Sequence, residues 1–322
     1  MIVVTGGAGF IGSNLVSGLN DSGNADVIVV DDLEHGDKFR NIEAMKIADY
    51  IDKTDFLSRL EQLRDVDVIL HQGACSDTME LDGRYMMKNN YEYSIDLLHY
   101  CQKKEIPFIY ASSASVYGSG PTFKEDPRYE HALNVYAYSK LLFDRYVRRF
   151  MEANPGHSQI VGLRYFNVYG PHEEHKGRMA SVAYHFKNQY LNEGHVRLFE
   201  GADGYANGEQ RRDFVWVGDV IDVNQHFLAN PQVSGIYNVG TGRAQTFNEM
   251  AVAVINKCAD NDSSLDELVS NQVIRYIPFP DALKGKYQSF TQADLDALRT
   301  TGFDEAFKTV EQGIDIYLKK AN

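Results

Sequence analysis

The stretch NVYAYSK, residues 134–140, places a tyrosine phenol four residues before a lysine ammonium. In a helix, side chains four residues apart share one face, so Tyr136 and Lys140 would lie side by side while Tyr138 points elsewhere. A nearby cation favours the phenolate and lowers the pKa of a tyrosine from about 10. Such a phenol can act as a general acid or base. The spacing is compatible with a proton-transfer pair, although an isolated Tyr-x-x-x-Lys pattern is more often structural.

A glycine-rich segment near the N-terminus has the spacing of a phosphate-binding loop. Gly6, Gly9 and Gly12 fall within IVVTGGAGFIGSNL, where a β-branched run precedes the glycines and a helical pattern follows. Glycines at these positions allow a tight turn and let backbone N–H groups approach a pyrophosphate at the start of a helix. The strand–glycine–helix context therefore predicts a dinucleotide site.

The residues after the second apolar run leave the choice of dinucleotide open. Asp31 and Asp32 lie about 20 positions beyond the glycines, where an acidic side chain usually binds the adenine ribose hydroxyls of NAD. Lys38 and Arg40 follow, and either cation could instead pair with the 2′-phosphate of NADP.

These groups need a scaffold, and alternating strand and helix patterns indicate one. Buried strands are expected at 2–4, 27–30, 66–70, 107–112 and 160–165, with helices at 13–20, 91–104 and 138–151. Such alternation predicts an α/β fold with a doubly wound parallel sheet of Rossmann type. The pattern loosens after about residue 170, and a run at 237–242 is expected to return to the sheet. We therefore expect a dinucleotide-binding domain formed by 1–168 with 213–242, and a smaller C-terminal α/β substrate domain formed by 169–212 with 243–322.

Bulk properties narrow the classes of function. The 322 residues, 43% apolar and 24% charged, suffice for about two domains. The net charge of -13 argues against a nucleic-acid or anionic-membrane surface, so an anionic ligand would need a local group of cations. Cys75, Cys101 and Cys258 are too widely spaced for a disulfide framework or a zinc site, which predicts reduced thiols, no metal and a cytoplasmic protein. No signal-peptide pattern and no apolar run of ~20 residues is present.

Several stretches together resemble the extended short-chain dehydrogenases/reductases, the family of nucleotide-sugar epimerases and dehydratases. They are TGGAGFIG, HQGACS, NNYEYS, ASSASVYG, NVYAYSK, RYFNVYGP and RDFVWVGDV. Within that family, FNVYGPHEEHKG, SVAYH, LFEG and KGKYQSFTQADL resemble the ADP-heptose 6-epimerases. The resemblance implies a tightly held nicotinamide cofactor and transient oxidation at C6 of a nucleotide-linked heptose, in the synthesis of the lipopolysaccharide core. It also implies a homo-oligomer, commonly a pentamer.

The resemblance also implies roles for individual residues. Tyr136 would be the acid/base, Lys140 would bind the nicotinamide ribose and lower the tyrosine pKa, and Ser113 would bond the reacting hydroxyl. Inverting a carbinol carbon needs a proton acceptor or donor on each face, and Lys176 would serve the second pose. The implied cofactor contacts are Gly6, Gly9, Phe10, Ile11, Gly12, Asp31, Asp32, Lys38, Lys53, Gln72, Gly73, Ala74, Cys75, Ser76, Asn89, Lys140, Val168 and Lys176. The implied substrate contacts are Ser113, Asn167, Arg178, His185, Phe199, Glu200, Gly201, Ala202, Arg212 and Tyr287.

Three features depart from the heptose-epimerase pattern. Those enzymes prefer NADP, with Lys38 and Lys53 near the 2′-phosphate, whereas Asp32 here stands in place of an asparagine. A second acid beside a phosphate is unfavourable, so NAD stays open beside NADP. Arg178 replaces a small hydroxyl residue, and the loop at 202–210 is longer than in some relatives.

Other functions make different demands on the same residues. A UDP-hexose 4-epimerase would share Tyr136, Lys140 and Ser113 but would not need Lys176. A dehydratase usually carries Asp-Glu beside the active-site hydroxyl, and ASSASVYG has neither acid. A non-enzymatic dinucleotide sensor would typically lose the tyrosine–lysine pair, which this chain keeps.

Overall fold

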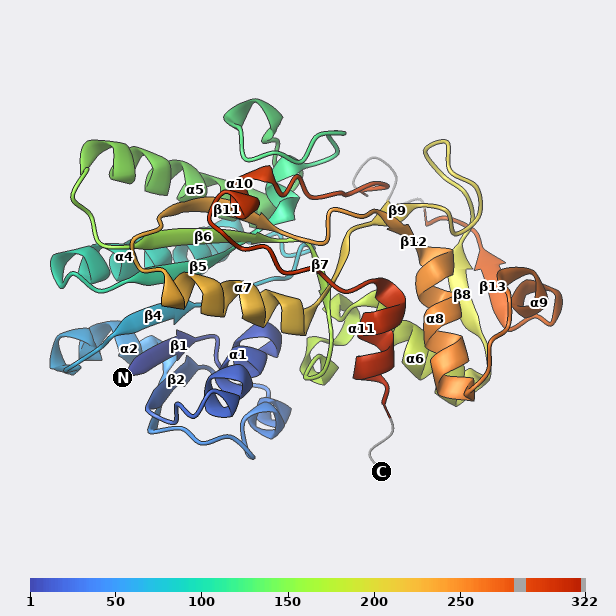
Figure 1. Cartoon of the computed structure of the whole chain (residues 1–322), viewed down its shortest axis with the longest axis horizontal. Coiled ribbons are helices and arrows are strands. Elements are labelled where there is room, and N and C mark those ends of the chain that lie inside the picture. Colours follow the sequence, from blue (N-terminus) through green and yellow to red (C-terminus); the bar gives the residue numbers. More distant parts are fainter. Residues whose placement is uncertain (281–287, 320–322) are drawn as a thin grey trace.

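A seven-stranded parallel sheet forms the centre of the computed structural model, which describes residues 1–280 and 288–319 (Figure 1). Its strands are β1 (Ile2–Thr5), β2 (Val27–Asp31), β3 (Asp49–Asp52), β4 (Val68–His71), β5 (Phe108–Ser113), β6 (Ile160–Tyr165) and β11 (Gly235–Val239). Their order is β11-β6-β5-β4-β1-β2-β3, so the direction of winding reverses between β1 and β4. This is the doubly wound Rossmann arrangement, and it confirms the predicted fold class.

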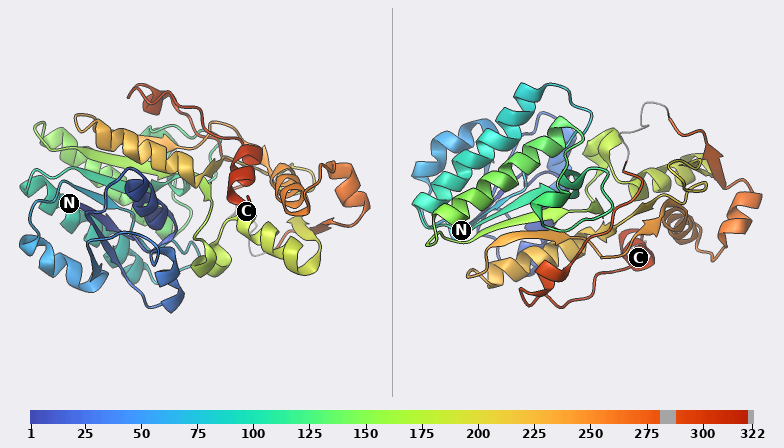
Figure 2. Two further views of the ribbon diagram at one scale, coloured as in Figure 1. Left: turned by 60° about the horizontal axis from the view of Figure 1, so that its bottom comes forward. Right: turned by 90° about the horizontal axis from the view of Figure 1, so that it is seen from above.

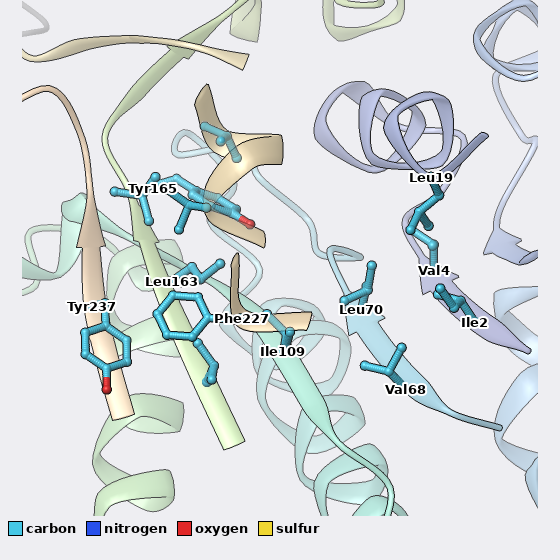
Figure 3. Packing of buried hydrophobic residues seen from close by; sticks show 14 of the residues in the cluster. Ile2, Val4, Leu19, Val68, Leu70, Ile109, Leu163, Tyr165, Phe227 and Tyr237 are labelled. Carbon is cyan, nitrogen blue, oxygen red and sulfur yellow. The ribbon is translucent and has the colours of Figure 1, made fainter. Parts of the chain in front are cut away.

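Two helical layers cover the sheet because successive side chains of a strand point to opposite faces (Figure 2). Val4 and Leu70 pack on the face covered by α1 (Phe10–Asp21) and α7 (Val217–Ala229), as Figure 3 shows for the strand side chains. Val3 and Ile69 pack on the other face, which is covered by α2 (Lys53–Arg59), α4 (Tyr93–Lys103) and α5 (Val135–Ala153). Strands buried on both faces read as continuous apolar runs, which is why five of them are visible in the sequence.

β3 is the one strand of this sheet with no predicted counterpart. Its residues, DYID, pair only with β2 at the edge of the sheet, and only Ile51 is buried. An edge strand that faces water needs no apolar run, so its sequence resembles a loop. The predicted run at 237–242 does return to the sheet, as β11 beside β6.

Beyond β6 the chain builds a second group of elements, at the right of Figure 1. Its helices are α6 (Val182–Glu193), α8 (Phe247–Ala259), α9 (Leu265–Ser270) and α11 (Val310–Tyr317). Its strand pairs are β7 (Asn167–Tyr169) with β10 (Phe214–Trp216), β8 (Val196–Phe199) with β13 (Ile274–Ile277), and β9 (Arg211–Arg212) with β12 (Gln245–Thr246). Phe186, Val254 and Ile314 join α6, α8 and α11 in a separate core. After it, α10 (Asp296–Arg299) brings Leu298 back to the core beneath the sheet.

Short helical segments complete the chain. They are η1 (Gly36–Asn41), η2 (Leu60–Gln62), α3 (Gly83–Met86), the π-helix η3 (Met87–Glu92), η4 (Ala114–Tyr117), η5 (Pro127–Tyr129) and η6 (Glu174–Met179). Among the described residues, no helix is long and apolar enough to cross a membrane.

Candidate active site

A cavity of about 640 Å³ opens at the carboxyl ends of the central strands, beside the point where the strand order reverses. Ligands of open α/β sheets bind in this crevice. The predicted residues that line it are Gly6, Gly9, Phe10, Ile11, Gly12, Asp31, Asp32, Lys38, Lys53, Gln72, Gly73, Ala74, Cys75, Ser76, Asn89, Ser113, Tyr136, Lys140, Asn167, Val168 and Lys176. The fold thus brings all the residues predicted for catalysis and for the cofactor to one cavity, where their roles stay predictions.

The glycine loop is shaped so that its backbone faces this cavity. Gly6 adopts φ +67°, and a Cβ on it would lie 2.6 Å from the backbone nitrogen of Gly73. A Cβ on Gly12 would lie 2.0 Å from the carbonyl oxygen of Gly6, so the helix could not pack so closely on the loop. Gly9 precedes α1 and offers no capping side chain, which leaves the first N–H groups of the helix to a ligand. The loop therefore fits the pyrophosphate of a dinucleotide.

At the end of β2, two carboxylates and two lysines form one charge-balanced cluster. Asp31 accepts a hydrogen bond from the Ala8 N–H at 2.8 Å and pairs with Lys38 at 2.5 Å. Asp32 pairs with Lys53 at 2.6 Å and with Lys38 at 3.2 Å. Burial opposes ionisation of Asp32, but the Lys53 hydrogen bond and the two lysine charges hold its pKa below the usual range. Both lysines expected at a 2′-phosphate are therefore paired with acids.

Tyr136 and Ser113 meet where α5 begins and β5 ends. Asn134 caps α5 by accepting from the Ala137 N–H at 2.8 Å, and this places Tyr136 in the first turn of the helix. Burial raises the pKa of Tyr136, and a hydrogen bond with Ser113 opposes that rise. Ser113 also accepts from the Ser115 hydroxyl at 2.9 Å. A phenol and a hydroxyl are thus presented together to the cavity.

Lys140 shares the helix face with Tyr136, as the spacing predicts, but it contacts a different group. Its Nζ donates to the carbonyl oxygen of Ala111 on β5 at 2.8 Å. Burial lowers the pKa of Lys140 to about 8, with the charge of Asp144 opposing the shift. The predicted lowering of the Tyr136 pKa by Lys140 is wrong for this structure, because the side chain reaches across to β5 and burial dominates the phenol.

Lys176 lies on η6, which follows α5 and β6 in the chain. Its side chain reaches the residue that ends the glycine loop, Phe10. Its Nζ lies 5.2 Å from the centroid of the Phe10 ring, a cation–π contact. Burial lowers the pKa of Lys176, and the charge of Glu173 opposes that shift. A lysine with a lowered pKa can accept and donate a proton nearer neutrality.

The π-helix η3 shapes the wall next to β4. Asn90 accepts from the Cys75 N–H at 2.8 Å and donates to the Cys75 carbonyl at 2.9 Å, so one side chain fixes both backbone groups. Asn89, its neighbour, lines the cavity. Single π turns inside α-helices often occur at functional sites because they re-aim side chains.

Most of the residues predicted for the substrate lie outside the lining of this cavity. Asn167 lines it, and His185 lies on α6 with its ring against Tyr184. Arg178 is exposed and pairs with Asp77 at 2.7 Å. Arg212 is buried in β9, with its guanidinium 5.9 Å from the centroid of the Phe247 ring.

The remaining substrate predictions fall on the turn after β8. The Phe199 ring packs against Phe279 at 5.4 Å, and the N–H of Glu200 donates to the Ile277 carbonyl at 2.8 Å. A Cβ on Gly201 would lie 2.2 Å from a backbone oxygen of the loop, and the Ala202 carbonyl accepts a hydrogen bond from the Tyr205 N–H. Tyr287 lies outside the described residues.

Some cavity residues carry no sequence pattern that would have identified them. His175, Asp77 and Tyr85 line the cavity from three different loops and short helices. His175 is adjacent to Lys176, so the HKG stretch that singled out Lys176 was the one sequence signal that could have pointed to His175. Burial is the main cause that lowers the pKa of His175 to about 4, and the charges of Lys38 and Lys176 lower it further. His175 is therefore a neutral imidazole near pH 7.

A second hollow, of about 710 Å³, lies between α8 and α11. Its charged side chains are Glu209, Glu249, Asp260, Asp262, Glu311, Asp315, Arg211 and Lys257. Six acids against two bases suit an anionic nucleotide poorly. The cavity at the strand ends, with four lysines and three aspartates, is the better candidate for that ligand.

Known proteins resemble this chain along its length. The model of the NAD dependent epimerase/dehydratase family matches residues 2–240. The chain is 58% identical over 325 residues to the ADP-L-glycero-D-manno-heptose-6-epimerase of Thiobacillus denitrificans, a match that covers 99% of this chain and 97% of that protein.

Solved structures agree with the sequence match. The Helicobacter pylori ADP-L-glycero-D-manno-heptose-6-epimerase has a TM-score of 0.82 at 34% identity, covering 98% of this chain and 94% of that one. The Thermus thermophilus UDP-glucose 4-epimerase, solved with NAD, has a TM-score of 0.76 at 26% identity, covering 98% and 97%. These likenesses confirm the predicted resemblance to the nucleotide-sugar epimerases.

Proposed function

The chain belongs to the NAD dependent epimerase/dehydratase family, and we propose that it interconverts ADP-D-glycero-D-manno-heptose and ADP-L-glycero-D-manno-heptose. The match to the Thiobacillus protein, 58% identical and nearly full length, carries the choice of substrate. The arrangement of Tyr136, Ser113 and Lys176 around one cavity supports the choice of reaction. A UDP-hexose 4-epimerase has the weaker support, since the UDP-glucose 4-epimerase of Thermus thermophilus is 26% identical.

The residues of the cavity fit a nicotinamide dinucleotide. The glycine loop and the start of α1 would hold its pyrophosphate, and Asp31, Asp32, Lys38 and Lys53 would surround the adenosine ribose. A nicotinamide bound there would supply reversible hydride transfer at C6.

The chain's own part is to move the hydroxyl proton in each pose. In one pose Ser113 would hold the reacting oxygen while Tyr136 accepts the hydroxyl proton as C6 is oxidised. In the other pose the oxygen lies on the opposite side, and Lys176 would donate a proton to it as C6 is reduced. The two groups exchange these roles in the reverse reaction. Burial supports this role because it lowers the pKa of Lys176 and so raises its neutral fraction.

For the cofactor we propose NADP, with NAD as the open alternative. The cluster of two acids and two lysines is the reason that both cofactors are considered. Lys38 and Lys53 could bind a 2′-phosphate, but that phosphate would compete with Asp31 and Asp32 for the two lysines. Replacing Asp32 with asparagine should therefore tighten NADP binding relative to NAD, which calorimetric titration of both cofactors would measure. If the ratio of the two dissociation constants does not change, the 2′-phosphate of NADP does not lie beside Asp32. The pentamer, the cytoplasmic location and the lipopolysaccharide pathway stay predictions.

One experiment tests the proposed function directly. The purified protein is incubated with ADP-D-glycero-D-manno-heptose, first without and then with added NADP or NAD, and the C6 proton is followed by NMR. A mixture with the L-glycero epimer is the expected result. No conversion of the heptose, together with conversion of UDP-glucose to its C4 epimer, would replace the heptose assignment by the UDP-hexose one.

A further inference from the structure

One fully buried carboxylate, that of Glu173, joins the two ends of the loop that carries Lys176. Its Oε1 accepts from the Gly170 N–H at 3.1 Å and from the Ser181 hydroxyl at 2.7 Å. Its Oε2 accepts from the Ser181 N–H at 2.5 Å. Gly170 follows β7, and Ser181 is the N-cap of α6, so Glu173 closes a twelve-residue span from Gly170 to Ser181 at its base.

These contacts favour the ionised form of Glu173. Two of the three partners are backbone N–H groups, which can only donate, while the Ser181 hydroxyl could also accept. Burial raises the pKa of Glu173, while hydrogen bonds from Ser181 and the charge of Lys176 oppose the rise. The backbone N–H of Lys176 donates to the Glu173 carbonyl oxygen at 2.9 Å, so the two residues share one turn of the loop. From this position the charge of Glu173 opposes the lowering of the Lys176 pKa by burial.

The other side of the loop is held to the dinucleotide half of the molecule. Asn14 donates to the Pro171 carbonyl at 3.0 Å, and Ser13 bonds the His172 imidazole at 3.0 Å. Asn41 bonds the His175 imidazole at 3.2 Å. Glu173 thus lies at the base of a loop whose first residues are fixed on α1 and whose His175, next to Lys176, is fixed on η1.

The charged and titratable groups around this loop come from the loop itself, from β2, η1, α6 and α11, and from the segment after β4. His172, Glu174, His175 and Arg178 lie on the loop itself. Asp31 of β2 and Lys38 of η1 face His175, and Asp77 pairs with Arg178. From α11, the Tyr317 phenol faces Glu173 and Glu174, with Tyr184 of α6 beside it. Burial raises the Tyr317 pKa and lowers the pKa of both histidines, so none of these three gains a charge near neutral pH.

We propose that Glu173 is a positioning residue for Lys176: it closes the loop at its base and supplies the negative charge that holds the ammonium form of Lys176 against the cavity. The inference rests on the proposed role of Lys176 in proton transfer. It adds that this role depends on a side chain that itself does not line the cavity.

Glu173→Gln tests this with Glu174→Gln as its matched control. Both changes remove one negative charge from adjacent positions, but Glu174 is exposed and does not contribute to the Lys176 pKa. We expect Glu173→Gln to lower kcat about 10- to 100-fold with little change in KM, because the base is misplaced while the substrate contacts remain. Glu174→Gln should leave kcat within about twofold of the parent enzyme, a margin that general surface changes stay within.

The pH dependence separates a positioning role from a merely structural one. Loss of the Glu173 charge destabilises the ammonium of Lys176, so the limb of the kcat profile that reports Lys176 should move to lower pH. The same move should appear without turnover, in the ¹³Cε titration of Lys176 in protein labelled with [¹³C]lysine and assigned with Lys176→Met. A titration of Lys176 that is identical in Glu173→Gln and Glu174→Gln would overturn the proposal.

Two further variants keep the outcomes distinct. If Glu173→Gln does not fold, Glu173→Asp keeps the charge and withdraws it by one methylene. This variant should reduce kcat by less, and the Lys176 titration should stay near that of the parent. If the Lys176 titration in Glu173→Asp moves as far as expected for loss of the charge, the proposal is contradicted. Lys176→Met tests the underlying role: full turnover in that variant removes Lys176 from the mechanism. The NMR titration of Lys176 would still measure whether Glu173 holds its charge.

Discussion

Lys140 and Lys176 line the same cavity, yet the two lysines are supported by different parts of the chain. Lys140 lies within a 19-residue helix and is held against β5. Lys176 lies on a six-residue 3-10 segment between β7 and α6. Burial lowers the pKa of each, and a nearby carboxylate opposes the shift: Asp144 for Lys140 and Glu173 for Lys176. The chemistry is alike, and the mechanical support differs.

The carboxylates show where this difference comes from. Asp144 accepts from Tyr110 and Ser112 at 2.9 Å each and from Arg164 at 2.8 Å, all within the core of the sheet. Tyr110 and Ser112 flank Ala111, the residue whose carbonyl holds Lys140, so Asp144 fixes that strand from both sides. Glu173 holds only a loop. A site built from both can hold Lys140 rigidly against β5 while Lys176 is carried by a segment that neighbouring elements must fix.

Removing each lysine should have the largest effect and should separate their roles. Lys140→Met and Lys176→Met are each expected to lower kcat about 10²- to 10⁴-fold, the range for loss of an acid–base group or its partner. Lys140→Met should weaken binding of the dinucleotide more than Lys176→Met does, because Lys140 is predicted to hold the nicotinamide ribose. Fluorescence titration with NADPH would measure this. Tyr136→Phe is the control that should lose turnover with binding intact, and equal cofactor affinity in both lysine variants would contradict the division of roles.

The supporting carboxylates should differ in their effect on stability. Among the described residues, Asp144→Asn leaves the fully buried Arg164 with Glu130 as its remaining ion-pair partner. Breaking a buried pair costs about 3–5 kcal/mol. Glu173→Gln leaves one donor facing another, which costs about 1–3 kcal/mol. Urea denaturation gives both free energies of unfolding, with the exposed Asp37→Asn as a control expected within about 0.5 kcal/mol of the parent. A larger loss in Glu173→Gln than in Asp144→Asn would reverse the comparison.

The same contrast explains what could be predicted from the sequence. Gly6, Tyr136 and Lys140 lie on a strand–turn–helix unit and a helix whose periodicities fix their neighbours locally. Spacing could therefore predict where these residues lie, while the predicted roles of Tyr136 and Lys140 also needed the family resemblance. The support of Lys176 depends on contacts between residues far apart in the chain, such as Asn41 with His175, which are 134 positions apart. Arg212 shows the same limit: a guanidinium favours a pyrophosphate by its chemistry, but its burial in β9 is set by tertiary packing.

The pH dependence of stability should follow the lowered pKa of Lys140. In the unfolded chain its pKa is 10.5, and in the folded protein it is about 8. Below pH 8 both states carry the proton, and the penalty for burying the ammonium is present in full. As pH rises from about 8 toward 10.5 the unfolded state binds more protons, so the folded state gains stability.

Relative to Lys140→Met, the parent protein should therefore gain about 2 kcal/mol in free energy of unfolding between pH 7 and pH 9.5. Lys176 should show the same sign against Lys176→Met, because burial lowers its pKa too. Denaturant titrations at each pH would measure both differences. If the parent loses stability relative to Lys140→Met over this range, the buried lysine is stabilised as a cation and the assigned direction is wrong.

The smallest expected effect concerns an ion pair between the loop that bears Lys176 and the loop after β4. Arg178, two residues after Lys176, pairs at 2.7 Å with Asp77, which lines the cavity from the loop after β4. Both side chains are partly exposed, and such pairs contribute roughly 0–1 kcal/mol. Asp77→Asn should therefore raise the rate of cofactor dissociation by no more than about fivefold, and the difference should vanish in high salt. Breaking the Arg197–Glu193 pair with Glu193→Gln is the control, since that pair lies on α6 and β8 away from the cavity. A tenfold or larger change that survives high salt would mean that Asp77 contacts the bound dinucleotide itself, and that the loop bearing Lys176 is not what retains it.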